Sequence, residues 1–432
     1  MPFKSIVTTI ADSSHEIPGE WKYWGTVCGA DDCIYGIPTN ARRVLKFDPR
    51  TGLAAEIGPD LGADGWKWKT GVLADNGCIY CAPLNANKIL KINTVDGIVT
   101  VLDVKLPESG SFLWAIGAVA ADNCIYFVPC NAHYIMKFNP IDESCKSVGH
   151  DFGEGCFKYC GVVALSDEDG SLICIPNEAS SIIRFYPATE TILCVGDEAD
   201  EDFLCCAGLM GLDGFIYAPS HENKGLIKID VNKNSYTFCR NSYPAHAHSH
   251  SSEYVGWGVG VVGNDGCLYW PPYCAGRTLK FDTQQDSFSL VGSDFGEIGQ
   301  DKWGGGAATL DGRIYCVPCS ASHILVIDPY MDFSNKMKGD MIKYPEDLGN
   351  LFLRNDQGIT ALESAIAKFG YDKVLNAIKE CLPAGTTLLC KGIEMKPFMV
   401  AASASCGEKD LTSALSVIYF LLRQSPHALF DK

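Results

Sequence analysis

The chain has 432 residues, 52 of them acidic and 35 basic, which gives a net charge of −17 at neutral pH. This balance, without any run of lysine and arginine, argues against a protein that tracks nucleic-acid phosphates. No stretch of about 18 apolar residues occurs, so we expect no membrane span. The first residues, MPFKSIVTTIADSSHE, lack the apolar core of a secretion signal. The 21 cysteines are scattered, many of them within apolar segments, which favours free thiols in the cytoplasm or another reducing compartment.

One unit recurs seven times: a strand that runs into a proline, a small polar loop, and a second strand that ends in an acidic turn. Two of the copies read CIYGIPTNARRVLKFDP and IYCVPCSASHILVIDP. The shared prolines are spaced by 43 to 53 residues and are Pro38, Pro83, Pro129, Pro176, Pro219, Pro272 and Pro318. A period in the forties with several strands per period is typical of a β-propeller with one blade per repeat. We therefore predict an all-β, seven-bladed propeller over residues 1–340.

The first repeat predicts a four-stranded blade with strands at 25–29, 33–37, 43–47 and 53–57. The inner strands of the other repeats are predicted at 71–74, 117–120, 161–165, 208–211, 258–262 and 305–310. Their residues are small, which suits strands that crowd a central axis. The seventh repeat lacks a fourth strand, and we predict that residues 4–10 supply it and close the ring, which removes an exposed edge.

The repeat stops near Tyr344. Residues 347–352, 360–369 and 372–381 have helical spacing of apolar side chains. The last segment, KPFMVAASASCGEKDLTSALSVIYFLLRQSPHALF, has the cadence of an ankyrin unit. We predict a small α-helical, ankyrin-like module over residues 341–432.

The segments that precede the inner strands form the first candidate site. They carry the aromatic and cationic residues Trp21, Lys22, Trp24, Trp66, Lys67, Phe112, Trp114, Phe157, Lys158, Trp257, Lys302 and Trp303. One interpretation is that these side chains wedge between blades and brace the ring. The other is an aromatic, partly cationic mouth over the central channel, which would suit a sugar, a planar metabolite or a peptide.

A second candidate ring lies two residues after each shared proline. Its members are Asn40, Asn85, Asn131, Glu178, His221, Cys274 and Ser320. The asparagines could face a ligand, or they could cap their own backbone by Asx-type hydrogen bonds. Glu178 and His221 break the pattern on adjacent blades and are the best candidates for a catalytic acid or base, or for metal ligands.

An insertion before the sixth repeat reads YPAHAHSHSSE. In an extended strand His246, His248 and His250 would share one side and could bind a divalent metal such as zinc, copper or nickel. The alternative is a surface loop with incidental histidines. Motifs for nucleophilic catalysis and phosphate binding are not found: no G-x-S-x-G, Walker A or H-E-x-x-H pattern occurs. A divalent metal is the one cofactor that the sequence suggests.

The blade unit IY-x-x-P-x-N-A-x-x-I-L-K-I-D-x-x-x-G resembles the repeats of seven-bladed propellers of the virginiamycin B lyase, NHL and gluconolactonase-like type. It also resembles those of uncharacterised propeller proteins of unicellular algae. The resemblance covers residues 20–330 and implies the fold. The lyase family uses a histidine and acidic residues around a metal in the channel, which Glu178 and His221 would echo.

Three functions follow as hypotheses. The first is a non-catalytic binding or scaffold protein that recognises a protein or small-molecule ligand with its propeller face and its tail. The second is a metal-assisted lyase or hydrolase with its site in the central channel. The third is a structural subunit of a larger assembly.

Overall fold

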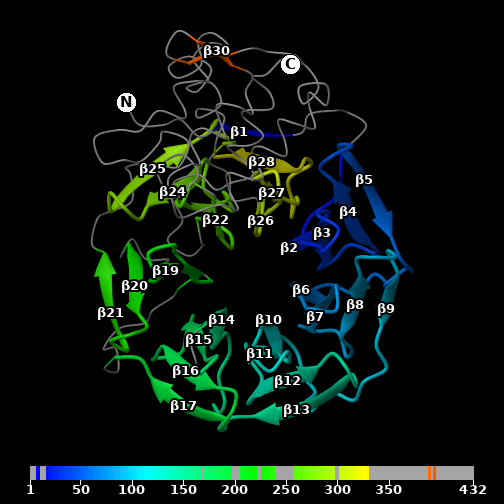
Figure 1. Cartoon of the computed structure of the whole chain (residues 1–432). Coiled ribbons are helices and arrows are strands. Elements are labelled where there is room, and N and C mark those ends of the chain that lie inside the picture. The colour runs from blue at the N-terminus through cyan, green and yellow to red at the C-terminus, as the bar shows by residue number, and fades with distance from the viewer. Residues whose placement is uncertain are drawn as a thin grey trace. The chain divides into compact units, whose positions relative to one another are not determined.

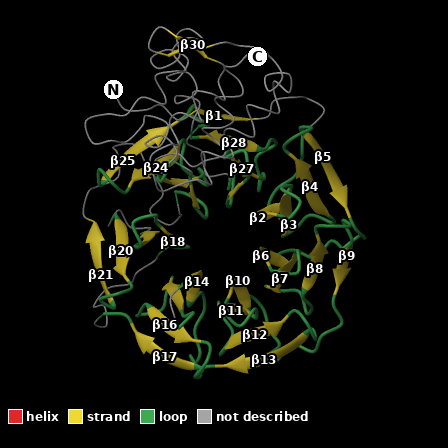
Figure 2. Ribbon diagram, in the orientation of Figure 1, coloured by secondary structure: helices red, strands yellow, loops and turns green. Residues whose placement is uncertain are grey.

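The computed structural model describes residues 6–9, 16–166, 169–196, 205, 207–220, 225–239, 256–263, 265–296, 301–329, 388–390 and 393–395. The chain divides into two units, Val7–Asp328 and Met1–Ile6 with Pro329–Lys432. The first unit is a β-propeller of seven four-stranded sheets around a central axis (Figures 1 and 2). The predicted seven blades of four strands are therefore confirmed.

The first four blades follow the chain from inner to outer strand. Blade 1 comprises β2 (Tyr23–Cys28), β3 (Ile34–Pro38), β4 (Val44–Asp48) and β5 (Leu53–Ile57). Blade 2 comprises β6 (Trp68–Leu73), β7 (Cys78–Pro83), β8 (Leu90–Asn93) and β9 (Val99–Val101). Blade 3 comprises β10 (Trp114–Val119), β11 (Ile125–Pro129), β12 (Ile135–Asn139) and β13 (Ser144–Val148). Blade 4 comprises β14 (Tyr159–Ala164), β15 (Leu172–Pro176), β16 (Ile183–Tyr186) and β17 (Thr191–Cys194).

The next two blades have shorter inner strands. Blade 5 comprises β18 (Leu209–Met210), β19 (Ile216–Pro219), β20 (Leu226–Asp230) and β21 (Ser235–Cys239). Blade 6 comprises β22 (Val261–Val262), β23 (Leu268–Trp270), β24 (Thr278–Asp282) and β25 (Ser287–Val291).

Blade 7 is completed by the N-terminal strand. It comprises β26 (Ala307–Ala308), β27 (Ile314–Cys316), β28 (Leu325–Asp328) and, as its outer strand, β1 (Ile6–Thr9), which is hydrogen-bonded to β28. Val7 is 2% exposed and packs in one core cluster with Val291 and Trp303. The predicted closure of the ring by residues near the N-terminus is confirmed.

The hydrophobic core lies between adjacent blades. The second strand of each blade is buried along its length, as in β3, because it is covered by a neighbour on both faces. One core cluster joins Tyr35 and Val44 of blade 1 to Trp68 and Ile79 of blade 2. The outer strands alternate toward solvent, as the burial pattern of β5 shows. The second strand of a blade is therefore covered by the neighbouring blades, whereas the outer strand is largely in contact with water.

A tyrosine, an aspartate and a lysine recur together in the blades. In blade 3, Asp122 Oδ2 accepts hydrogen bonds from Tyr126 Oη at 2.8 Å and from Lys137 Nζ at 2.7 Å. Burial raises the pKa of Asp122, but the bonds from Lys137, Tyr126 and the backbone outweigh burial, so the net pKa is lowered. The same grouping occurs at Asp31, Asp213 and Asp265. The aspartate gives a largely buried tyrosine hydroxyl a hydrogen-bond acceptor and pairs with the charge of the repeated lysine.

The second unit is described only at a hairpin, in which β29 (Leu388–Cys390) pairs with β30 (Ile393–Met395). The helices predicted at 347–352, 360–369 and 372–381 and the ankyrin-like segment lie outside the described residues. Within the part of the chain that is described, no helix is long and apolar enough to cross a membrane.

Candidate functional site

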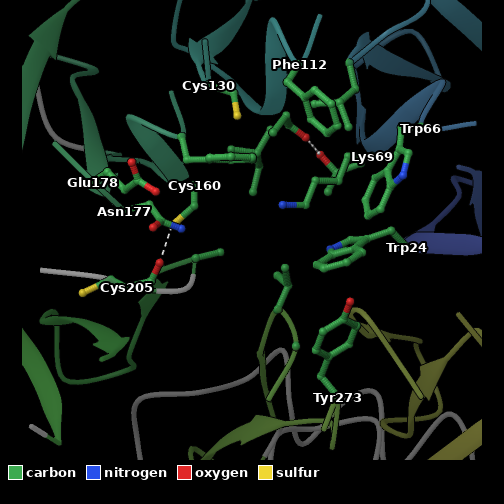
Figure 3. A pocket seen from close by; sticks show the side chains of 18 of the residues that line it. Trp24, Trp66, Lys69, Phe112, Cys130, Cys160, Asn177, Glu178, Cys205 and Tyr273 are labelled. Carbon is green, nitrogen blue, oxygen red and sulfur yellow. Dashed lines mark hydrogen bonds between the residues drawn. The ribbon is translucent and has the colours of Figure 1, made fainter. Parts of the chain in front are cut away.

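A cavity of about 530 Å³ lies at one end of the central channel, inside the propeller unit (Figure 3). Its walls come from the inner strands of blades 1 to 6, from the segments just before them, and from the loops that follow the second strands, which supply Glu178 and Tyr273. The lining is mostly apolar, with a few polar groups: Lys69, Asn177 and Glu178 among the larger ones. This volume and lining are typical of a small-molecule site.

Six aromatic side chains from five blades form one continuous side of the cavity, which we call the aromatic wall: Trp21, Trp24, Trp66, Phe112, Phe157 and Tyr273. The ring centroids of Trp24 and Tyr273 are 4.8 Å apart, and those of Trp21 and Trp66 are 4.7 Å apart. Phe112 continues the row at 5.9 Å from both Trp66 and Phe157. The wall presents broad apolar faces together with ring edges, which suits a flat ligand.

Four members of the aromatic wall occupy one repeat position with a left-handed backbone. The φ angles are 52° at Trp21, 56° at Trp66, 55° at Phe112 and 51° at Phe157. Blade 7 has Asp301 at this position, with φ of 44°. A bulky non-glycine residue in this region is strained and must be held by its surroundings.

The asparagines of the second candidate ring supply this restraint. The N–H of Trp66 donates to Asn40 Oδ1 at 2.8 Å, and the N–H of Phe112 donates to Asn85 Oδ1 at 2.8 Å. The same bond joins Phe157 to Asn131 and Trp21 to Ser320 Oγ. Each side chain thus latches the aromatic residue of the next blade, instead of capping its own loop.

The lysines before the inner strands are used by the fold. Lys22, Lys67, Lys158 and Lys302 are each 4–6% exposed. Lys158 Nζ donates to the carbonyls of Asn131, Ala132 and Gly155, and the others likewise bond main-chain carbonyls. Burial lowers the pKa of these lysines, that of Lys22 to about 8. The structure places their ammonium groups between blades, where they brace loops.

The tryptophans divide into two groups. Trp114, Trp257 and Trp303 are at most 4% exposed, and each Nε1 donates to a carbonyl twenty residues later, at 2.9–3.0 Å. These residues brace their own blades, although Trp257 also touches the edge of the cavity. Trp21, Trp24 and Trp66 belong to the aromatic wall. The bracing interpretation therefore fits Trp114, Trp257 and Trp303, whereas a binding role for the cavity-lining tryptophans stays a prediction.

Lys69 stands at the channel-facing position that follows Trp68. Its Nζ lies 4.5 Å from the centroid of the Trp24 ring and points into the cavity (Figure 3). No hydrogen bond or ion pair joins this ammonium to another described side chain. The sequence interpretation did not include Lys69, because it started this inner strand at residue 71. The available signal was a charged residue at a repeat position that holds alanine, cysteine and glycine in blades 3, 4 and 6.

Glu178 occupies in blade 4 the position of the latching asparagines. The backbone N–H of Glu178 donates to Phe157 O, just as the N–H of Asn40 donates to Trp21 O. The carboxylate of Glu178, in contrast, is exposed and lines the cavity. Cys156 Sγ lies 3.7 Å from its Oε2 atom. His221, the partner suggested by the sequence, lies outside the described residues, and so do His246, His248 and His250. The described residues contain no group of three or more metal-ligating side chains.

Tyr273 of the aromatic wall is fixed by Asp301 of blade 7. Burial raises the pKa of both groups, and a side-chain hydrogen bond joins them. Cys274 Sγ lies 3.8 Å from Asp301 Oδ1. Asp301 therefore contributes to the site by orienting an aromatic ring at the place where its own blade lacks one.

Seven-bladed propellers are the class that this fold and site define. No family model matches the sequence, and no curated protein matches it. Among solved structures, a streptogramin B lyase is similar with a TM-score of 0.60 and 15% identity, over 75% of this chain and 97% of the lyase. An inactive variant of Staphylococcus aureus virginiamycin B lyase with quinupristin is similar with a TM-score of 0.60 and 14% identity, over 76% of this chain and 99% of the lyase. The extracellular domain of a putative hybrid two-component system from B. thetaiotaomicron is similar with a TM-score of 0.55 and 10% identity, over 76% of this chain and 42% of that domain's chain. At these identities the similarity shows the fold alone.

Proposed function

We propose that this protein is a small-molecule-binding propeller whose ligand is flat and largely apolar and lies against the aromatic wall. The observation that carries the proposal is the row of six aromatic side chains along one side of a cavity of about 530 Å³. Cavities that bind small molecules have this size and this mixture of apolar lining and few polar groups.

The aromatic wall is separate from the parts that hold the ring together. Blade bracing is already provided by the buried tryptophans at the repeat position of Trp114 and by the carbonyl-bound lysines. Four of the six wall residues instead hold strained left-handed backbones, one position before the repeat position of these lysines and two positions before that of Trp114. Strain that is maintained by a dedicated latch favours a role in recognition over a role in stability.

Binding of N-phenylnaphthylamine, an uncharged dye that fluoresces in apolar sites, tests the proposal. We expect saturable binding to the intact chain and about tenfold weaker binding for Trp66→Asn, because a stacked ring is lost. Asparagine keeps the left-handed backbone, since short polar residues adopt it readily and Asp301 does so in blade 7. Ile141→Asn, at a turn residue that is 88% exposed, is the control.

Two outcomes would contradict the proposal. One is the absence of saturable dye binding to the wild-type protein. The other is equal affinity of the wild-type, Trp66→Asn and Ile141→Asn proteins, which would place the dye elsewhere.

The other roles suggested by the sequence depend on residues outside the described part of the chain. A metal-assisted lyase would need His221 beside Glu178, and a scaffold role for the tail would need residues 341–432. The small-molecule role is preferred because the cavity and its aromatic wall support it.

A further inference from the structure

We infer that the ligand of this cavity is a flat aromatic or alicyclic acid whose single carboxylate or sulfonate binds the Lys69 ammonium. This inference rests on the proposed function and adds the chemical class of the ligand.

Lys69 is not required by the packing of the inner strand. The positions that correspond to it, each directly after a residue paired with the shared proline, hold Ala115, Cys160 and Gly258 in blades 3, 4 and 6. Small residues therefore suffice to build this part of a blade. A charged side chain that departs from the repeat and faces a cavity is a candidate for binding.

The charge of Lys69 has no counter-ion among the described residues. Other blade lysines are paired: Lys46, Lys137 and Lys280 have a carboxylate oxygen at 2.7–2.9 Å. Lys69 Nζ instead lies over the face of Trp24. An ammonium in a mostly apolar lining gains most from an anionic ligand, because a charge-assisted hydrogen bond is stronger there than in water.

The cavity wall near Lys69 offers no negatively charged side chain that could pair with its ammonium. Burial raises the pKa of the Cys130 and Cys160 thiols, that of Cys160 to about 12, and Lys69 lowers both pKa values only in part. Both thiols are therefore neutral at pH 7. No charged thiol therefore competes with an anionic ligand for the Lys69 ammonium.

Glu178 limits the ligand to one acidic group. It is the one carboxylate among the described residues that line the cavity, and Figure 3 shows it on the side opposite Lys69. A second acidic group at the far edge of a flat ligand would approach this carboxylate and be repelled. A neutral or amino group at that edge would be accepted.

Two dyes with the same aromatic body separate the charge from the shape. Anilinonaphthalene sulfonate carries an acidic group that N-phenylnaphthylamine lacks. We expect Lys69→Met to weaken binding of the sulfonate by about tenfold to a hundredfold, the usual worth of a hydrogen bond to a charged group. The affinity for the uncharged dye should stay within about twofold, since its contacts are apolar.

Two further variants control this experiment. Lys69→Arg retains the charge and should retain most of the preference for the sulfonate, which shows that the site is intact. Lys146→Met removes an exposed lysine that pairs with Glu190 at the outer edge of blade 4 and should change neither affinity. The inference is overturned if the uncharged dye binds but Lys69→Met leaves sulfonate affinity unchanged. If neither dye binds the wild-type protein, the proposed function itself fails.

Displacement of the bound sulfonate tests the limit to one acidic group. Naphthoate should displace it at several-fold lower concentration than naphthalene dicarboxylate, and Glu178→Gln should reduce this difference. Equal displacement of the dye from the wild-type protein by the two acids would contradict the role given to Glu178.

Discussion

The Oδ1 atom of Asn40, in blade 1, accepts a hydrogen bond of 2.8 Å from the backbone N–H of Trp66, at the start of blade 2. Trp66 has a left-handed backbone, and its ring belongs to the aromatic wall. A side chain of one blade therefore sets the position of a cavity-lining ring in the next. The repeat of this latch explains how a symmetric scaffold presents a row of aromatic rings.

Loss of one latch should destabilise the propeller. We expect Asn40→Ala to lower the free energy of unfolding by about 1–2 kcal/mol, because a partly buried N–H loses its acceptor. Asn40→Ser should cost less, since Ser320 Oγ makes the corresponding bond to Trp21 at 3.1 Å. Urea denaturation of the three proteins measures the difference. Equal midpoints for the wild-type and Asn40→Ala proteins would show that the latch contributes nothing.

The aspartates of the tyrosine–aspartate–lysine groups should make stability depend on acid pH. Burial raises the pKa of Asp31 and of Asp122, but the net pKa of each is lowered in the folded state, because hydrogen bonds from Lys46 and Cys33 at Asp31, and from Lys137, Tyr126 and the backbone at Asp122, outweigh burial. In the unfolded chain these carboxyls protonate near pH 4. The unfolded state then binds more protons, so their stabilisation is complete above about pH 5 and is lost as pH falls through the folded pKa. Thermal unfolding from pH 7 to pH 2 measures this loss, and Asp122→Asn should make the slope shallower.

The closing strand should be necessary for stability. Val7 is 2% exposed in the core of blade 7, so Val7→Asp should lower the free energy of unfolding by about 3 kcal/mol or more, the cost of burying an unpaired charge. Val95→Asp makes the same change at a residue that is 78% exposed and should be nearly neutral. Similar unfolding temperatures for the two variants would refute closure by β1.

Adjacent glycines on one side of the channel should differ sharply in their tolerance of a side chain. A Cβ at Gly304 would lie 2.7 Å from Trp24 O, whereas a Cβ at Gly305 would lie 3.3 Å from Val259 Cβ. We expect Gly304→Ala to cost roughly 1–3 kcal/mol and to disturb Trp24, because a backbone atom cannot move aside easily. Gly305→Ala should cost much less. Equal unfolding free energies would argue against the close approach of these inner strands.

The fold could be predicted from the sequence because it is periodic. The shared prolines fix the number of blades, and the missing fourth strand of the last repeat indicates a closing strand elsewhere. The order of strands within a blade follows from the pattern of apolar and polar residues, which recurs in each repeat. These features are local, so one copy supports the interpretation of the others.

The site was harder to predict because its geometry depends on contacts between blades. A lysine before an inner strand has the same sequence context whether its ammonium is free to bind a ligand or, as in Lys158, donates to main-chain carbonyls. An asparagine after a proline does not show that its acceptor serves the next blade. Lys69 was missed because a bulge between Trp68 and Gly71 starts β6 earlier than the small residues indicate. Tyr273 and Asp301 come from adjacent blades and form a side-chain hydrogen bond, a contact that their separation in the sequence does not indicate.

Fluorine NMR of the protein labelled with fluorotryptophan tests the central claim most directly, because each tryptophan reports separately on the bound dye. With saturating N-phenylnaphthylamine, the resonances of Trp21, Trp24 and Trp66 should shift, since these rings line the cavity. Those of Trp114, Trp270 and Trp303 should stay in place, since these rings are buried within blades. Single tryptophan-to-phenylalanine variants assign the signals. A spectrum in which the dye moves none of the three wall tryptophans would contradict binding at the channel mouth.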